Sequence, residues 1–350
     1  MSLQLEVIEL SRNDHAAWDQ AVADSIGGSP YSCSAYLTAL SNATGGEYRL
    51  LAVCDESRIL GGIGLYIRAH GRREYVRGRY LLYYNGPFVR RISEASPIAM
   101  EETTHRVLTC IESRLRSTDY SRVQIRPRHT VSDCRPFLQQ GWQAHPTFSY
   151  IVDISDIEAC FSRMHRNVRR QIRQAERTGI QATRSDNIDG FFSLHQQTCQ
   201  RKGFPTYLGR DSMIAFYDEL RESNLARLYM VGEPDSPPSA GVLVLASDHP
   251  VTHTVCAASR SGKLPSGANT WLRWHVFKDL SECGYAENDL TDAHEPAVAK
   301  FKRQLGARLV VSQQLGLPPT INDHLRAAYG LAKRELKQIL KRMLPLRGAE

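Results

Sequence analysis

The residues with the clearest chemical potential lie late in the chain, where Phe301 and Lys302 fall in a short predicted helix at 296–305. A lysine pointed into a cleft supplies positive charge that stabilises negative charge in a transition state. A surface lysine beside a core phenylalanine is the structural alternative. His253 is the other candidate catalytic residue, because it lies between two threonines on a predicted central strand. Single histidines are, however, more often structural or exposed.

A second group of residues could hold phosphate. Five arginines flank the apolar stripe of a predicted helix at 161–178, namely Arg166, Arg169, Arg170, Arg173 and Arg177. Like charges at helical spacing repel each other, so the helix tolerates a cost. The pattern is typical either of a solvated face or of a surface that binds a phosphate backbone.

Two further basic clusters raise the same question. A predicted amphipathic helix from 322 to about 344 carries Lys333, Lys337 and Lys341, and a hairpin at 68–79 is rich in arginine. The C-terminal helix could bind nucleic acid, lie on an anionic membrane surface, or pack on its own domain. Three separated clusters fit a large polyanion better than a single small phosphate.

The loop at 259–268 leads from a predicted strand into a predicted helix and contains Ser259 and Gly267. Free backbone N–H groups and the positive end of a helix dipole can bind an anion at such a place. A glycine-bearing loop is a weak signal alone, and a plain connector is the alternative.

Several classes of protein and site lack support in the sequence. The eight cysteines contain no C-x-x-C pair, and no metal-binding or nucleophile-elbow motif is present. We therefore expect no metal site, and reduced cysteines in a cytoplasmic protein. The N-terminus lacks the pattern of a secretory signal, and no stretch of 18 apolar residues predicts a transmembrane helix.

The length and the net charge of the chain indicate its domain organisation and the kind of partner that it binds. The chain has 350 residues, which favours two domains, and 44 Lys and Arg against 37 Asp and Glu give a net charge of +7 that favours an anionic partner. Helices and strands alternate in a similar order in both halves. The pattern predicts an α/β (α+β) fold of two similar modules, 1–150 and 151–320, each a mixed sheet flanked by helices, followed by a basic helix at 321–350.

The order of several short motifs resembles the FemAB/FemX-like transferases. The segment 164–180 is similar to that family's K-x-R-x-x-I-x-K-A-x-x-x-G-I pattern, and 198–203 is similar to T-x-x-R-x-G. The segment 301–306 resembles F-K-x-x-F-G, with Leu305 in place of the usual phenylalanine. Each motif is modestly specific, but they occur in family order. The first half of the chain matches more loosely, through marks such as 84–87.

The resemblance implies two tandem GNAT acyltransferase modules with the active cleft near their junction. Family members transfer an amino acid from aminoacyl-tRNA to an amine on a peptidoglycan precursor, and relatives act on peptide antibiotics. It implies that Lys302 stabilises charge at the donor ester, that Phe301 shapes its channel, and that Arg201 binds the acceptor with support from Thr198. Tyr207, Ser259 and Gly267 complete the expected substrate-binding set. The family usually has a tyrosine near the position of His253, so the histidine could take the place of that tyrosine.

Three hypotheses follow. The first is an amide-forming aminoacyltransferase whose partners are tRNA and a small peptide or amine acceptor, with no cofactor beyond the donor and with peripheral membrane contact as a further candidate. The second is an acyl-CoA-dependent N-acyltransferase, which is weakened because the CoA-binding glycine pattern is not legible at 259–268. The third is a non-catalytic protein that binds a polyanion or a membrane surface.

Overall fold

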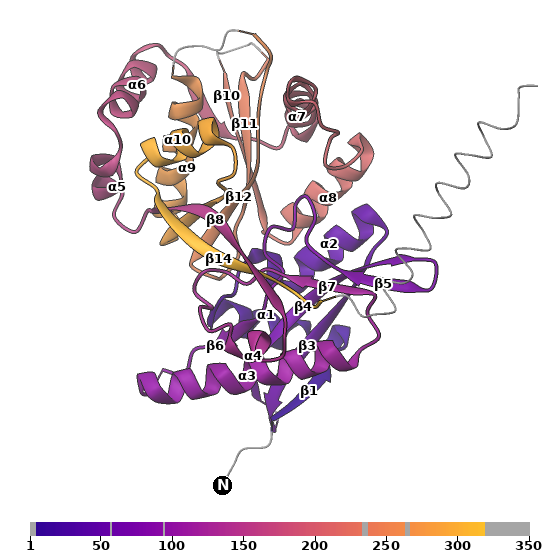
Figure 1. The fold of residues 1–350 in the computed structure, drawn as a ribbon. Helices are drawn as coiled ribbons and strands as arrows, with labels where there is room; N and C mark the ends of the chain where they lie inside the picture. Colours follow the sequence, from indigo (N-terminus) through magenta and orange to yellow (C-terminus); the bar gives the residue numbers. More distant parts are fainter. Residues whose placement is uncertain (1–4, 57, 94, 233–236, 263–266, 319–350) are drawn as a thin grey trace, which may run out of the picture.

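The computed structural model describes residues 5–56, 58–93, 95–232, 237–262 and 267–318. The described chain forms one continuous sheet in the order β1-β3-β4-β5-β7-β14-β8-β13-β12-β11-β10-β9. An N-terminal half contributes β1 to β7 with α1 to α4, and a C-terminal half contributes β8 to β14 with α5 to α10. Figure 1 shows the two halves one above the other, with the long strands β8 and β14 between them.

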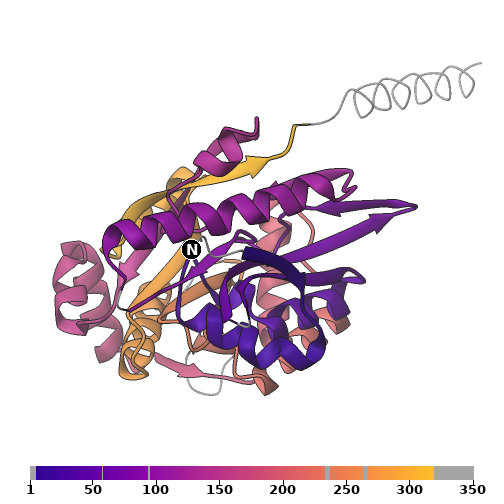
Figure 2. The same ribbon diagram turned by 90° about the horizontal axis from the view of Figure 1, so that it is seen from below.

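The N-terminal half is a largely antiparallel sheet with helices on both faces. Its main strands are β1 (Leu5–Glu9), β3 (Glu47–Asp55), β4 (Arg58–His70), β5 (Arg73–Val76) and β7 (Arg122–Ile125), and the short β2 (Ser25–Ile26) pairs with β6 (Phe88–Arg90). Alternate residues of β3 point to opposite faces, as strand geometry requires. One face packs against α3 (Pro97–Ser117) and the other against α1 (His15–Ala23) and α2 (Ser34–Thr44). Figure 2 shows α3 lying along this sheet, and α4 (Arg135–Leu138) is a single turn beside it.

The C-terminal half repeats the layered arrangement. Its strands are β9 (Gln181–Arg184), β10 (Ala226–Gly232), β11 (Ala240–Leu245), β12 (Val251–Ser259) and β13 (Glu287–Asp292). One face packs against α5 (Ile157–Arg163), α6 (Arg166–Arg177) and α9 (Ala268–Glu282), and the other against α7 (Ile188–Lys202) and α8 (Arg210–Glu222). Helix α10 (Pro296–Gln304) follows β13 and carries Lys302.

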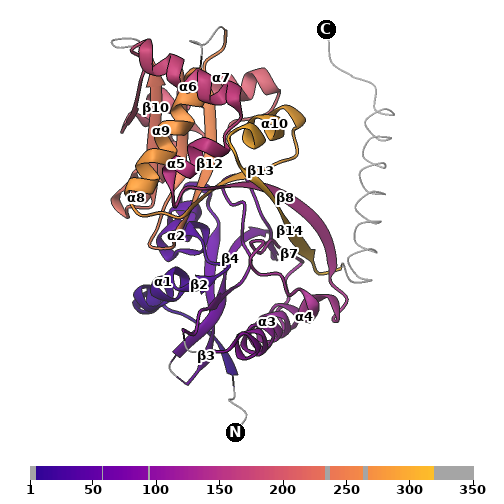
Figure 3. The ribbon, with the colours of Figure 1, turned by 90° about the vertical axis from the view of Figure 1, so that its left-hand side faces the viewer.

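Two long strands join the halves. β14 (Arg308–Gly316) pairs along its whole length with residues 143–151 of β8 (Gln143–Asp153), and β14 also pairs at its end with β7 of the N-terminal half. Figure 3 shows both strands running from one half into the other. Residue 150, near which we expect a boundary, therefore lies inside a hydrogen-bonded strand, which explains why no linker marks it. The division into 1–150 and 151–320 stays a prediction, and 321–350 lies outside the described residues.

The halves also share one hydrophobic core. Trp18, Tyr36 and Leu40 of the N-terminal half belong to the same buried cluster as Phe216 and Leu220 of α8. Because buried apolar area is the main stabilising term in folding, this shared cluster holds the halves together. The side chain of Asn42 adds hydrogen bonds of 3.1 Å to both carboxylate oxygens of Glu219 at its edge.

Two predicted elements are wrong. The aromatic run 80–84 predicts a strand, but the structure has only an isolated bridge between Arg79 and Leu82, and Leu81 adopts a left-handed φ of 71°. The hydroxyl of Tyr36 donates to the Leu81 carbonyl and holds this turn. The single helix predicted at 161–178 is two helices, because Met164 and His165 have extended ψ values of 146° and 141° and the His165 ring caps α6.

Candidate active site

The candidate site lies where two parallel strands separate. β12 and β13 pair only over Val251–His253 and Glu287–Asp289, although β12 continues to Ser259 and β13 to Asp292. Beyond the last paired residue of β12, two side-chain hydrogen bonds join the strands at Thr254. Its hydroxyl donates to the Asn288 side chain at 3.1 Å, and its carbonyl accepts from the Thr291 hydroxyl at 3.2 Å. The facing edges of the two strands carry backbone groups that sheet pairing between them does not use. A substrate amide or ester could bond to such groups.

Lys302 brings a cation to the end of β13. Its side chain is 8% exposed, and its ammonium donates to the carbonyl oxygens of Thr291, at 3.3 Å, and of Asp292. Burial and the nearby Arg273 guanidinium lower the pKa of Lys302 to about 8. Arg273 is itself buried and donates to the Thr254 hydroxyl at 3.3 Å. Phe301 is half-buried and packs against the hydrophobic core of the C-terminal half.

Helix α7 brings Thr198 and Arg201 to the end of β12, where both bond to Ser259. The Thr198 hydroxyl donates to the Ser259 carbonyl and accepts its N–H, both at 3.0 Å. The exposed Arg201 guanidinium reaches the Ser259 hydroxyl at 3.2 Å and nearby carbonyl oxygens at 3.4 to 3.5 Å. Three residues from distant parts of the sequence thus meet as one group. Their role in acceptor binding stays a prediction.

Tyr207 contributes to a contact between the two halves. Its ring stacks on Tyr80, with centroids 4.7 Å apart and planes 9° apart, and its N–H donates to the ring of His195 at 3.2 Å. Burial raises the pKa of the Tyr207 hydroxyl above its ordinary value. Tyr80 is 55% exposed, so the stacked pair has one ring in solvent at the junction.

Gly267 is the N-cap of α9 and has a φ of 81°, a left-handed value that favours glycine. A Cβ atom at this position would lie 3.0 Å from the Gln171 carbonyl oxygen of α6. The Thr270 hydroxyl donates to the Gln171 side chain at 2.9 Å. Gly267 therefore allows the start of α9 to pack closely on the basic helix α6.

His253 lies beneath the site. It is fully buried, and among the described residues neither ring nitrogen has a hydrogen-bond partner. The rings of Tyr31 and Tyr84 lie 5.1 Å and 5.6 Å from it. Burial, together with the nearby Arg128, lowers the pKa of His253 well below its ordinary value, so the ring is neutral. Its predicted catalytic role stays a prediction, and the ring has no exposed surface in this structure.

Helix α6 has a basic face beside an apolar stripe, as the sequence predicts. Arg166, Arg170, Arg173 and Arg177 are exposed and Arg169 is half-buried, while Val168, Ile172 and Ala175 are buried. Within the described part of the chain, none of the five forms an ion pair with a carboxylate. The backbone N–H of His165 donates to the Gln304 carbonyl at 2.9 Å, so α6 begins beside the helix that carries Lys302. Lys333, Lys337 and Lys341 lie outside the described residues.

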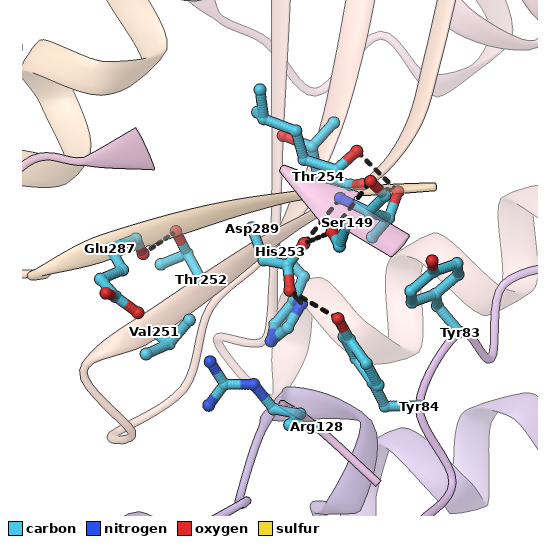
Figure 4. A network of polar contacts seen from close by, with 12 residues as sticks. Tyr83, Tyr84, Arg128, Ser149, Val251, Thr252, His253, Thr254, Glu287 and Asp289 are labelled. Carbon is cyan, nitrogen blue, oxygen red and sulfur yellow. Dashed lines mark hydrogen bonds and ion pairs between the residues drawn. The ribbon is translucent and has the colours of Figure 1, made fainter. Parts of the chain in front are cut away.

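Asp289 lies at the centre of a buried network and is not among the residues predicted to form the site. Its carboxylate accepts hydrogen bonds from the hydroxyls of Tyr84, at 2.9 Å, and Ser149, and from the N–H of Thr291 at 2.7 Å. Figure 4 shows these groups converging from both halves, with Arg128 below them. Tyr84 and Asp289 are 205 positions apart, so no local pattern links them. The only sequence signal for the pair is that Tyr84 lies in the family-like segment 84–87 and Asp289 in the family-like segment 289–290.

Local packing explains how Tyr84 reaches Asp289. The side chain of the next residue, Asn85, donates to the Gln124 carbonyl at 3.0 Å and accepts the Arg126 N–H at 2.9 Å. A Cβ atom on Gly86 would lie 2.2 Å from the Cα of Pro127, so only glycine fits there. Segment 84–86 is therefore fixed against the end of β7 and directs the Tyr84 ring towards the C-terminal half.

Two other observations bound the site. Over the described residues, no group of three or more His, Cys, Asp or Glu side chains could hold a metal ion. Among the helices that the structure describes, none is long and apolar enough to cross a bilayer. A polar cavity of about 690 Å³ also opens at the junction, near the start of β12, and includes Asp19, Arg221 and His249 in its lining. None of the predicted site residues lines that cavity.

Comparison with known proteins places the fold. A family model described as an acetyltransferase (GNAT) domain matches residues 162–303. FemX has a similar structure, with a TM-score of 0.68 and 16% identity over 88% of this chain and 96% of that chain. A search of curated proteins found no match.

Two more solved structures are similar at lower identity. The C-terminal domain of a putative lysylphosphatidylglycerol synthetase from Agrobacterium fabrum has a TM-score of 0.56 and 11% identity, over 90% of this chain and 95% of that chain. A tandem GNAT protein from the clavulanic acid biosynthesis pathway has a TM-score of 0.51 and 11% identity, over 89% and 98%. The predicted fold is therefore confirmed: the chain has a FemX-like tandem GNAT fold, which is an acyltransferase fold.

Proposed function

We propose that the protein forms an amide bond by moving an aminoacyl group from aminoacyl-tRNA to an amine of a peptide, peptidoglycan-like or antibiotic acceptor. The observation that carries the proposal is the Lys302 ammonium, held almost out of solvent where β12 and β13 diverge. A charge in such a place acts through a lower effective dielectric than a charge in water. It is therefore suited to an oxygen that becomes negative during reaction.

In the proposed reaction, that oxygen belongs to the donor ester. The acceptor amine attacks the ester carbonyl carbon, a C–N bond forms, and the carbonyl oxygen becomes an oxyanion. The C–O bond to the ribose then breaks, and the amine loses a proton to water, to the substrate or to a side chain. Lys302 stabilises the oxyanion or the leaving ribose oxygen, and Arg201, beside Ser259, holds the acceptor.

The basic face of α6 favours tRNA as the donor. Its arginines form no ion pairs with described carboxylates, and α6 begins beside α10 through the hydrogen bond between His165 and Gln304. A polyanion bound along α6 would lie next to the helix that carries Lys302. Phosphate contacts of this kind are independent of base sequence and sensitive to salt.

A second candidate is an acyl-CoA-dependent N-acyltransferase, for which two observations speak. The family model that matches 162–303 is described as an acetyltransferase domain. In addition, Gly267 caps a helix of 15 residues, whose N-terminus could face the phosphates of CoA. This candidate shares the role of Lys302 and differs only in the donor.

One experiment separates the candidates. The protein is incubated with a mixture of charged tRNAs and a pool of peptide amines, and in parallel with acyl-CoA thioesters, while amide products and free tRNA are measured. The proposal expects deacylated tRNA above background and an amide product that RNase treatment of the donor abolishes. Product formed from acyl-CoA and unaffected by RNase supports the second candidate, and the absence of product from either donor contradicts both.

A further inference from the structure

The proposed reaction assigns no role to Asp289, whose carboxylate is buried. Asp289 lies at the last position of β13 that pairs with β12 and is fully buried. Of its two oxygens, Oδ2 accepts from the Tyr84 hydroxyl at 2.9 Å, and Oδ1 accepts from the Ser149 hydroxyl and the Thr291 N–H. A buried carboxylate with three donors is a well-satisfied group, and one donor comes from the other half of the protein.

The neighbouring residue Thr291 has an unusual backbone. Its φ is 57°, in the left-handed region that β-branched residues rarely adopt because it is strained. Such a conformation persists only where the surroundings hold it. Here Asp289 accepts the Thr291 N–H at 2.7 Å, and the Thr291 hydroxyl donates to the Thr254 carbonyl at 3.2 Å.

The consequence of this conformation is the direction of the Thr291 carbonyl. Its oxygen accepts from the Ser149 hydroxyl at 2.9 Å and from the Lys302 ammonium at 3.3 Å. Asp289 is therefore connected to Lys302 through a single residue, and the one hydroxyl hydrogen of Ser149 is shared between the Asp289 carboxylate and the Thr291 carbonyl. Moving the carboxylate would release Thr291 from the left-handed region and turn its carbonyl away from the ammonium.

We propose that Asp289 is a positioning residue for Lys302, and that its hydrogen bond from Tyr84 makes the placement of the ammonium depend on contact between the two halves. The inference rests on the proposed function of Lys302 as the charge that stabilises the reacting oxygen. It adds a reason why two modules act as one site: the N-terminal half supplies a hydroxyl that fixes the lysine of the C-terminal half.

The charge of Asp289 gives the proposal a direct readout. The charged groups that act on Lys302 are Arg273 and Lys202, which lower its pKa, and Asp292 and Asp289, which raise it. Neutralising Asp289 removes one of the two groups that favour the ammonium, so Lys302 should lose its proton at lower pH. Because this charge also acts on Lys302 through space, Tyr84→Phe, which keeps the carboxylate, tests the positioning separately.

The test compares Asp289→Asn, which keeps the size of the side chain, with the wild-type protein. The proton affinity of Lys302 is read from the pH dependence of its competitive labelling by acetic anhydride, located by peptide mapping. The proposal expects the apparent pKa of Lys302 to be lower in this variant than in the wild-type protein. Unchanged labelling of Lys302 in a folded Asp289→Asn protein overturns it.

Tyr84→Phe tests the link between the halves and keeps the proposal testable if Asp289→Asn fails to fold. This variant should lower kcat about tenfold with KM unchanged, because the ammonium is misplaced in the bound complex. The matched control is Tyr217→Phe, since the Tyr217 hydroxyl also contacts a carboxylate, that of Asp186 at 3.3 Å, within the C-terminal half. Equal effects of Tyr84→Phe and Tyr217→Phe contradict the link.

The labelling readout separates this inference from the proposed function, because it needs no activity. A shift in Lys302 labelling without any transferase activity in the wild-type protein supports the positioning and contradicts the function. Transferase activity together with unshifted labelling and an unaffected Tyr84→Phe variant supports the function and contradicts the positioning.

Discussion

The Lys302 ammonium lies 3.3 Å from the carbonyl oxygen of Thr291, and the lysine side chain is 8% exposed. A cation with so little contact with water is held by backbone oxygens and opposed by the nearby Arg273. Burying an ammonium disfavours its charged form, so this placement costs stability in the folded state. Such a cost is typical of functional sites, where charge is placed for chemistry rather than for folding.

The first prediction concerns stability. The pKa of Lys302 is lowered from 10.5 to about 8 in the folded state, so between these values the unfolded state binds more protons than the folded state. The free energy of unfolding should therefore rise with pH across that window. Lys302→Met should remove this rise and stabilise the protein at neutral pH, by an amount on the order of 1–3 kcal/mol.

The measurement is urea unfolding at several pH values, with Lys300→Met as the matched control. Lys300 is an exposed lysine on the same helix, so its replacement should leave the pH dependence as it is. A Lys302→Met protein that is less stable than the wild type at neutral pH would contradict this prediction, because it would show that the hydrogen bonds of Lys302 to the Thr291 and Asp292 carbonyls outweigh the cost of burying the ammonium.

The second prediction concerns the pH dependence of the reaction. If the ammonium is the active form, the contribution of Lys302 to the rate should be complete below its pKa, at about 8, and fall as pH rises through it. This decline is superimposed on the rise in rate that accompanies deprotonation of the acceptor amine. Lys302→Arg should abolish that decline, whatever its effect on the maximal rate, because a guanidinium stays protonated. Single-turnover rates, corrected for spontaneous ester hydrolysis, provide the measurement. A decline that persists unchanged in Lys302→Arg would assign it to another group.

The third prediction concerns the basic helix. Replacing Arg166, Arg170 and Arg173 by alanine should weaken tRNA binding at least about tenfold and flatten its dependence on salt, because each lost phosphate contact reduces the salt slope by nearly one unit. The control is a variant with Arg12 and Arg58 replaced, which are exposed arginines of the N-terminal half. Filter-binding curves at several salt concentrations measure both quantities. Equal weakening in the two variants would indicate a general charge effect.

The fourth prediction separates acceptor binding from chemistry. Arg201→Ala should raise the KM for the acceptor about tenfold or more and change kcat little, because the guanidinium by Ser259 holds the acceptor rather than the reacting ester. Arg210→Ala is the control, since Arg210 is an exposed arginine at the start of the next helix and pairs with Asp189. A loss of kcat alone in Arg201→Ala would place Arg201 in the chemical step.

The fifth prediction concerns the shared core. Phe216 is fully buried in the cluster that crosses both halves, so Phe216→Ala should lower the free energy of unfolding by about 3–5 kcal/mol. Because the cluster joins the halves, unfolding should remain a single transition by fluorescence and by circular dichroism. Two separate transitions in the wild-type protein would show that the halves fold independently.

The sequence predicts the regular elements well where hydrophobic periodicity is strong. It predicts helices at 96–117 and 188–202 and strands at 226–232 and 240–246. The structure has these elements at 97–117, 188–202, 226–232 and 240–245. Failure occurs where tertiary contacts override local preference. The aromatic residues at 80–84 favour a strand, but the Tyr36 hydroxyl and the Asp289 carboxylate draw this segment into a turn.

The site was predictable only in part, for a related reason. Lys302, Arg201 and Thr198 lie in motifs that resemble a known family, so sequence order alone brings them forward. Asp289 lies in a short family-like mark that indicates no role for it, and Ser149 lies in none. Their importance appears only when β8, β13 and the Tyr84 segment meet in space. No local pattern encodes contacts between residues so far apart in the chain.

The central claim is that Lys302 supports transfer of an aminoacyl group from tRNA to an amine. The most direct measurement follows the release of uncharged tRNA and the formation of amide from a mixed pool of aminoacyl-tRNAs and peptide amines, with wild-type, Lys302→Met and Lys300→Met proteins side by side. The account predicts RNase-sensitive product with the wild type and Lys300→Met, and a rate about 10²–10³ times lower with Lys302→Met. Equal rates for all three proteins, or no product from any of them, would contradict it.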